Sequence, residues 1–185
     1  MAGLLRIPRS RGALSGTLLV LLGIWGGLVP FAGPYFHYAY TPGSAWTYTT
    51  GRLWLEILPA VGTLAGGLMV LVSAFRPVAI VGAWLAAVSG AWFVIGGALA
   101  ALWTNGAVTQ ETPAGAPLVR TVEQIGFYTG LGVAVVFLAA LALGRFSVVT
   151  VRDGRIAAGK PLAAGKPAAD TTEEVSDDTH ATPVV

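Results

Sequence analysis

The sequence predicts an all-α integral membrane protein with a bundle of four transmembrane helices and a disordered C-terminal tail. Two observations lead to this prediction. The chain of 185 residues is 55% hydrophobic and only 11% charged, whereas a soluble domain carries about 25% charged residues. Its apolar residues also form four long segments, each of at least the roughly 20 residues that cross the hydrocarbon core of a bilayer. Such a chain needs lipid as its solvent, because it would otherwise aggregate.

The four predicted spans cover residues 13–33, 53–74, 78–103 and 122–144. Soluble core helices are rarely this long and this uniformly apolar. The first and third spans carry no charged residue, while the second contains Glu56 near its start and the fourth contains Glu123 at its entrance. Residues 1–12 form a basic N-terminal segment, residues 13–145 the transmembrane domain, and residues 146–185 a polar cytoplasmic tail.

The distribution of lysine and arginine predicts the orientation in the membrane. Of the 11 basic residues, only Arg52 and Arg120 lie in the two longer loops. The others lie before the first span, between the second and third, or after the fourth. Because basic residues concentrate in cytoplasmic segments, we expect a plasma-membrane protein with both termini in the cytoplasm. The abundance of alanine, glycine and arginine is typical of a GC-rich bacterial genome.

The tail changes character after the fourth span. The pentapeptide AAGKP occurs twice, at residues 157–161 and 163–167, and acidic residues follow over 170–178. Few apolar side chains, together with proline, glycine and like charges, favour disorder from about Ile156 onward.

Small residues spaced four apart predict close helix packing, because they let two backbones approach each other in lipid. Packing within one bundle is the simpler interpretation, and self-association of two copies through one face is the alternative. The pairs are Gly12 with Gly16, Gly23 with Gly27, Gly62 with Gly66, Ala86 with Gly90, and Gly126 with Gly130.

Two helical hairpins related by duplication are a further prediction. Gly-Ile-Trp at residues 23–25 matches Gly-Ala-Trp at residues 90–92. Arg52 and Arg120 each precede an acid by three or four residues at the start of a span. Chance stays open as an explanation, because glycine, alanine and tryptophan are frequent in this chain.

Polar and aromatic side chains gather where the predicted spans meet the outer face. Arg52 and Glu56 are four residues apart and so share one helical face. Glu56 and Glu123 lie near helix N-termini, where the macrodipole favours negative charge, and an ionisable residue inside a span is by default a sign of function. The candidate site comprises His37, Tyr38, Trp46, Tyr48, Arg52, Glu56, Arg120, Glu123 and Gln124.

Each member also has a structural interpretation, which the sequence favours. Glu56 lies shallow and would be an anchor paired with Arg52, with its side chain snorkelling to the interface, rather than a proton carrier. His37 would be a solvated loop residue rather than a ligand, because a metal site needs three or four ligands. The loop aromatics would form an interfacial belt rather than a ligand platform.

Several function classes find no support in the sequence. The chain has no cysteine, which excludes disulfides, thiolate metal sites and thiol redox chemistry. No phosphate-binding loop, dinucleotide fingerprint, HExxH motif or nucleophile elbow occurs, so no catalytic residue, cofactor or metal is predicted. The net charge of +2 is too small to indicate nucleic acid as a partner.

The leading hypothesis is therefore a non-enzymatic accessory or scaffold component of the cell envelope. Its partners are the lipid bilayer and either another membrane protein or further copies of itself. One alternative is a small oligomeric transporter or channel with Glu56 and Glu123 in an outer vestibule. The other is a membrane enzyme that acts on lipid at the outer face through His37 and Glu56.

Two stretches resemble a known family. The tripeptide at residues 23–25 and the segment SGAWFVIGG at residues 89–97 are similar to the SPW-repeat membrane proteins of bacteria, which pair helices that carry Gly-x-Trp and Ser-Pro-Trp motifs. The Ser-Pro-Trp tripeptide itself is absent, since Ser89 is followed by Gly90. The whole chain also resembles small four-span actinobacterial membrane proteins of unknown role. Neither resemblance implies an activity or a functional residue.

Overall fold

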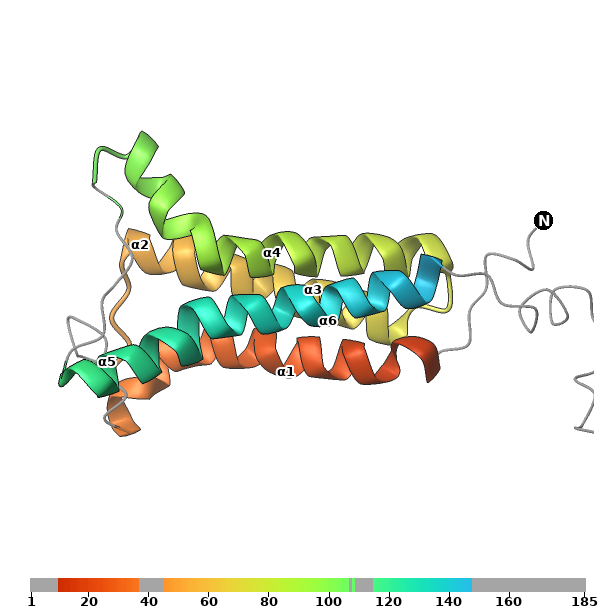
Figure 1. The fold of residues 1–185 in the computed structure, drawn as a ribbon, viewed down its shortest axis with the longest axis horizontal. Helices are drawn as coiled ribbons and strands as arrows, with labels where there is room; N and C mark the ends of the chain where they lie inside the picture. The colour runs from red at the N-terminus through yellow and green to blue at the C-terminus, as the bar shows by residue number, and fades with distance from the viewer. Residues whose placement is uncertain (1–9, 37–44, 107, 109–114, 148–185) are drawn as a thin grey trace, which may run out of the picture.

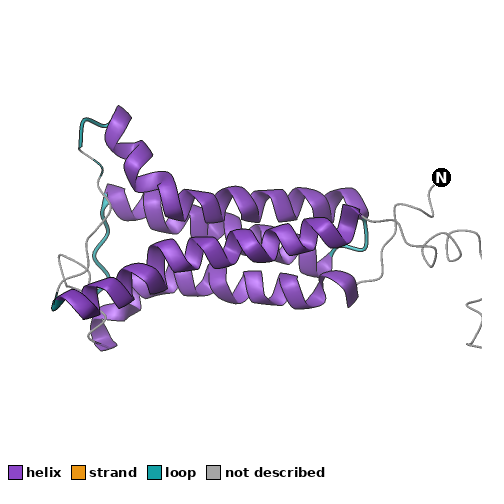
Figure 2. Cartoon of the chain, in the orientation of Figure 1, coloured by secondary structure: helices purple, strands orange, loops and turns teal. Residues whose placement is uncertain are grey.

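The structure is a computed structural model, and it describes residues 10–36, 45–106, 108 and 115–147. The described part contains four helical segments that are long and apolar enough to cross a membrane, which confirms the predicted all-α transmembrane bundle and a multi-pass membrane protein (Figure 2). The predicted disordered tail lies outside the described residues. The four segments are Gly12–Tyr35, Thr50–Val72, Arg76–Trp103 and Pro117–Ser147.

The second and fourth spans are not continuous α-helices, because each is interrupted by a π-helical turn. In the first span, α1 runs into a short 3-10 turn. The elements are α1 (Ser10–Ala32), η2 (Gly33–Phe36), α2 (Thr50–Arg52), the π turn η3 (Leu53–Ile57), α3 (Leu58–Val72), α4 (Arg76–Trp103), α5 (Pro117–Gln124), the π turn η4 (Ile125–Thr129) and α6 (Gly130–Ser147).

The helices pack in chain order around the bundle (Figure 1). α1 lies against α3, α3 against α4, and α4 against α6, which returns to contact α1. Successive helices therefore lie side by side in the bundle. We call the end with the start of α1, the end of α6 and the α3–α4 turn the terminus end, and the opposite end the loop end (right and left in Figure 1).

A tight turn joins the second and third spans at the terminus end. The backbone N–H of Phe75 donates to the hydroxyl of Ser73 across 3.0 Å, and α4 begins at the next residue with Pro77 in its first turn. Proline fits there because the N–H that it lacks would have no helical partner. The Nε of Arg76 donates to the carbonyl oxygen of Phe146 across 2.5 Å, which caps the last turn of α6.

Glycines bring neighbouring backbones close together in the middle of the bundle and toward the terminus end. A Cβ atom added to Gly66 on α3 would lie 2.4 Å from the carbonyl oxygen of Gly82 on α4. One added to Gly90 would lie 2.9 Å from the carbonyl oxygen of Gly132 on α6. These small residues of the second and third spans therefore pack within one bundle. Gly126 is exposed, so the small-residue pair of the fourth span takes no part in this packing.

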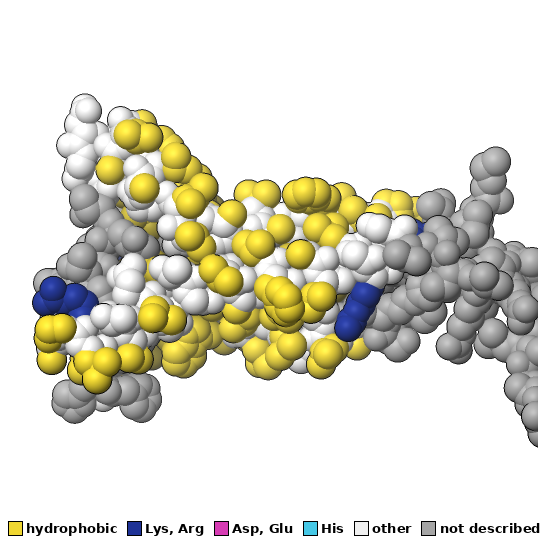
Figure 3. Space-filling model, viewed as in Figure 1, with side chains coloured by type: hydrophobic (Ala, Val, Ile, Leu, Met, Phe, Trp, Pro, Cys, Tyr) yellow, Lys and Arg dark blue, Asp and Glu magenta, His cyan; other side chains and the backbone are white. Residues whose placement is uncertain are grey.

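An apolar core fills the centre of the bundle, and apolar side chains also cover its sides. Figure 3 shows hydrophobic side chains along the length of the bundle and basic side chains at its two ends. This distribution is the one that a membrane-spanning bundle requires. The central core comprises Leu19, Ala60, Ala86, Phe93, Leu131, Val135 and Ala139.

Candidate functional site

Four polar side chains are buried near the loop end of the bundle. Arg52 is 0% exposed, Glu56 and Tyr128 are each 1% exposed, and Glu123 is 3% exposed. We call these four residues the buried polar layer. They come from the second and fourth spans, which bring together residues about 70 positions apart in the chain.

The position of the two acids corrects the sequence-based interpretation. That interpretation predicts shallow anchors whose side chains snorkel to the surface, whereas both carboxyl groups point into the bundle. The physical reason is helical phase. Glu56 lies four residues before the buried Ala60, and Glu123 lies four residues before the buried Phe127, so each acid lies at the outer end of its helix's interior stripe.

Both acids lie in or beside a π turn. Glu56 belongs to η3. Glu123 lies in α5, two residues before the start of η4, and η4 contains Tyr128. A π turn adds one residue to a helix and is frequent at functional sites. Each π turn directly precedes the long helix of its span, as two duplicated hairpins would require. When the two π turns are aligned residue by residue, the position of Glu56 in η3 corresponds to Tyr128 in η4, and not to Glu123.

Tyr128 links the second and fourth spans. Its hydroxyl donates a hydrogen bond to Oε1 of Glu56 across 2.5 Å, a length within the about 2.5–2.7 Å of hydroxyl-to-carboxylate bonds. The ring of Tyr128 packs edge-on against Phe127, with ring centroids 4.6 Å apart. Phe127 in turn lies 6.3 Å from the ring of Phe93 on α4. Aromatic rings therefore join the buried polar layer to the apolar core.

Arg52 connects the buried polar layer to the chain that precedes α2. Its Nη1 donates to the carbonyl oxygen of Thr47 across 2.6 Å. Its backbone N–H donates to Oγ1 of Thr49 across 3.1 Å, which caps the start of the helix. Trp46 has a φ of +59°, an uncommon conformation for a bulky side chain, and its ring stacks on Phe31 with centroids 5.7 Å apart. The segment is thus held both by the buried arginine and by α1.

Aromatic side chains project from this end of the bundle. Tyr35 is 64% exposed, Trp46 is 67% exposed and Tyr48 is 63% exposed. We call these three residues the loop-end aromatics. Two of them, Trp46 and Tyr48, belong to the predicted site, and the structure places them outside the buried polar layer.

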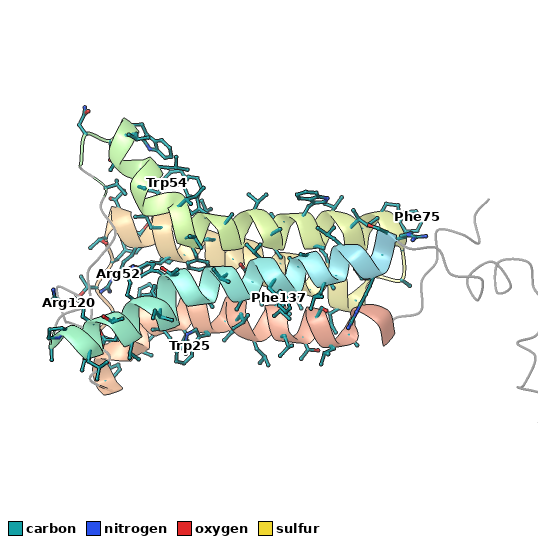
Figure 4. All side chains as sticks on the ribbon, viewed as in Figure 1. Trp25, Arg52, Trp54, Phe75, Arg120 and Phe137 are labelled. Atoms are coloured by element: carbon teal, nitrogen blue, oxygen red, sulfur yellow. The ribbon has the colours of Figure 1, made fainter. Side chains whose placement is uncertain are left out.

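The remaining predicted residues do not join the buried polar layer. Arg120 is exposed, with its Nη2 3.4 Å from the carbonyl oxygen of Gly115, and Figure 4 shows it at the outer edge of the loop end. Gln124 is half-buried. His37 and Tyr38 lie outside the described residues.

A groove of about 710 Å³ is lined by η3, α3 and α4 and extends to the loop end of α4. That part of α4 bends away from the bundle (Figure 1), and Figure 4 shows Trp54 beside the bend. The indole N–H of Trp92 donates to the carbonyl oxygen of Trp54 across 2.9 Å, and the rings of Trp92 and Trp103 stack with centroids 6.0 Å apart. The sequence does not predict this groove, because it depends on the bend.

The buried polar layer offers two carboxyl groups, one guanidinium and one phenol. Such a set can hold charge inside the bundle and exchange hydrogen bonds between spans. Within the described ranges, no group of three or more histidine, cysteine, aspartate or glutamate side chains could hold a metal ion. Sequence reasoning missed Tyr128, whose hydrogen-bond partner Glu56 lies 72 positions earlier in the chain. The burial of Glu56 also separates it from the outer surface, where the lipid-enzyme hypothesis needs it.

Comparison of the chain with protein-family models, with curated proteins and with solved structures found no match in any of the three. The resemblance to SPW-repeat proteins therefore stays a prediction.

Proposed function

We propose that the chain is a non-enzymatic accessory or scaffold protein of a bacterial plasma membrane. It binds a membrane-protein partner through the loop-end aromatics. One observation carries the proposal. Trp46 is held in a left-handed backbone conformation, stacked on α1, and still leaves 67% of its surface exposed.

Backbone strain of this kind costs about 1–3 kcal/mol and persists only where the surroundings hold it in place. The stack on Phe31 and the hydrogen bond from Arg52 to Thr47 supply that support. Exposed tryptophan and tyrosine are the side chains that most often dominate protein interfaces. A strained, supported and exposed tryptophan is therefore better explained by a partner than by packing.

The orientation is part of the proposal. The Lys and Arg bias places both termini in the cytoplasm, so the loop end faces the outside of the cell. A partner would then contact the loop-end aromatics at the outer membrane–water interface. Tryptophan and tyrosine side chains are enriched at that interface, because each has an apolar ring and a polar N–H or O–H group.

The test is affinity purification of the tagged full-length protein from its own cells in mild detergent, with protein identification by mass spectrometry. The proposal expects a stoichiometric partner that is lost when Trp46 and Tyr48 are both replaced by alanine. Trp84→Ala is the matched control, since Trp84 is 59% exposed and lies on α4 away from the loop end. The proposal fails when the partner is retained by the double variant or is lost equally from the control.

A second candidate is a small oligomeric transporter, which the buried polar layer favours. Ionisable residues inside a membrane bundle are costly and commonly lie on substrate or proton pathways. The central core beyond the layer is apolar, so a path would have to form between copies. This candidate expects Glu56→Gln to abolish flux in proteoliposomes, and a fully active variant would end it.

A further inference from the structure

We propose that the groove between α3 and α4 binds one acyl chain of a glycerolipid from the membrane leaflet at the loop end. The proposal goes beyond the proposed function, because neither the loop-end aromatics nor the buried polar layer forms this groove. It rests on the groove's length, its volume and the chemistry of its walls.

The length of the groove matches one leaflet. On the second span its wall runs from Trp54 in η3 to Ala65 in α3, which is about 16 Å at 1.5 Å per residue. The hydrocarbon core of a bilayer is about 30 Å thick, so the wall that the second span forms covers about half of it, on the side of the loop end. A partner helix that crosses the whole membrane would need a surface that continues past this point.

The volume also favours a thin occupant. A helix with its side chains has a diameter of about 10–12 Å, so a space of about 710 Å³ would hold only one to two of its turns. Pockets that enclose a small ligand usually measure about 300–1,000 Å³. A flexible hydrocarbon chain can lie along such a groove.

The walls select for hydrocarbon. Leu58 and Val61 on α3 and Leu85 and Val88 on α4 line the groove. Apolar walls of this kind gain nothing from a polar ligand and lose no hydrogen bond to an acyl chain.

The polar groups at the groove are few, and two of them donate hydrogen bonds within the protein. The indole N–H of Trp92 is bonded to Trp54, and the hydroxyl of Thr104 donates to the carbonyl oxygen of Ala100 across 2.7 Å. Ser89 contributes one more hydroxyl, and its side chain is only 7% exposed. Nothing in the lining therefore calls for a charged or strongly polar ligand, and a lipid headgroup would stay at the interface.

The test is native mass spectrometry of the full-length protein, purified in mild detergent and then incubated with phosphatidylglycerol that carries two palmitoyl chains. Wild-type protein is expected to retain one lipid. Val88→Trp, which fills the groove from its rim, is expected to lower the lipid-bound fraction about tenfold. Val88 is 61% exposed, so the larger side chain does not disturb the core.

Val81→Trp is the matched control. Val81 is 58% exposed and lies on the same helix, seven residues toward the terminus end and outside the groove, so this variant should bind lipid as wild type does. Val61→Trp tests the opposite wall and replaces Val88→Trp if that variant does not elute as a folded species. The proposal is overturned if wild type retains no lipid, or if the groove variants retain as much as Val81→Trp.

Discussion

The terminus half and the loop half of the bundle contain the same four spans but are packed in different ways. In the terminus half, the α3–α4 contact is close enough that the carbonyl oxygen of Gly82 would lie 2.4 Å from a Cβ on Gly66. The buried side chains that pack there are Val70, Ala79, Ala83, Ala142 and Phe146. The α3–α4 contact of this half is therefore tight, and an apolar cluster packs beside it.

The loop half departs from that pattern at three places. It contains both π turns, the four residues of the buried polar layer, and the groove beneath the bent end of α4. Each departure lowers packing density or adds buried polarity, and both are costly in a membrane. The comparison indicates that the terminus half holds the bundle together, whereas the loop half carries the features from which function is inferred.

The largest expected effect on stability follows from replacing Arg52, the buried arginine of the loop half. Arg52→Met removes the only buried basic side chain of the described residues and leaves two buried carboxyl groups without its charge. The free energy of unfolding should fall by about 3–5 kcal/mol, measured by thermal or SDS-induced unfolding of the purified protein. Arg120→Met, at an exposed arginine, should change it little. Equal effects would mean that burial of Arg52 is not important.

The next effect tests the tight packing of the terminus half. Gly66→Ala puts a methyl group against the backbone of α4, and overpacking of this kind costs about 1–3 kcal/mol. The control is Gly144→Ala, because a Cβ there has no neighbour within 4 Å. If both variants unfold like wild type in the same assay, that result would contradict the close approach of Gly66 on α3 to Gly82 on α4.

An effect of comparable size tests the link between the spans in the loop half. Tyr128→Phe removes the hydrogen bond to Glu56 while keeping the ring, and should cost about 1.5–3 kcal/mol if the carboxyl group is charged. Tyr48→Phe removes a hydroxyl from a side chain that is 63% exposed and should be neutral. Hydrogen exchange over residues 50–60 should rise only in the first variant.

The smallest effect concerns the cap at the terminus end. Arg76→Met removes the hydrogen bond to the carbonyl oxygen of Phe146, and helix-end contacts of this type contribute about 0.3–1 kcal/mol. Arg145→Met serves for comparison, since Arg145 is exposed in the last turn of α6. A larger loss than that of Tyr128→Phe would mean that this helix-end contact contributes more to stability than the hydrogen bond between Tyr128 and Glu56.

Much of the fold could be predicted from the sequence, because membrane spans follow from length and apolar content alone. The structure has helices at all four predicted segments, although α4 begins at Arg76 and the fourth span begins at Pro117, earlier than predicted. Both starts lie beside a proline and an arginine, outside the uniformly apolar stretches on which the predicted bounds were based. The small-residue spacing also predicted close packing, and only three-dimensional contacts could show which neighbour each glycine faces.

The candidate site was less predictable. Residue type and position identified Arg52, Glu56 and Glu123, but not the direction of their side chains, because a shallow position in a span is compatible with either face. Tyr128 was missed because a tyrosine near a span end reads as an interfacial residue. The groove depends on the bend of α4, for which no proline within the bent part gives a signal.

The most direct test of the division between the two halves is site-specific photocrosslinking in living cells. A photoreactive amino acid is placed at Trp46 in one strain and at Trp84 in another, since both positions carry exposed tryptophans. The account predicts one discrete protein adduct from position 46 and none from position 84. The same adducts from both positions, or none from position 46, would contradict it.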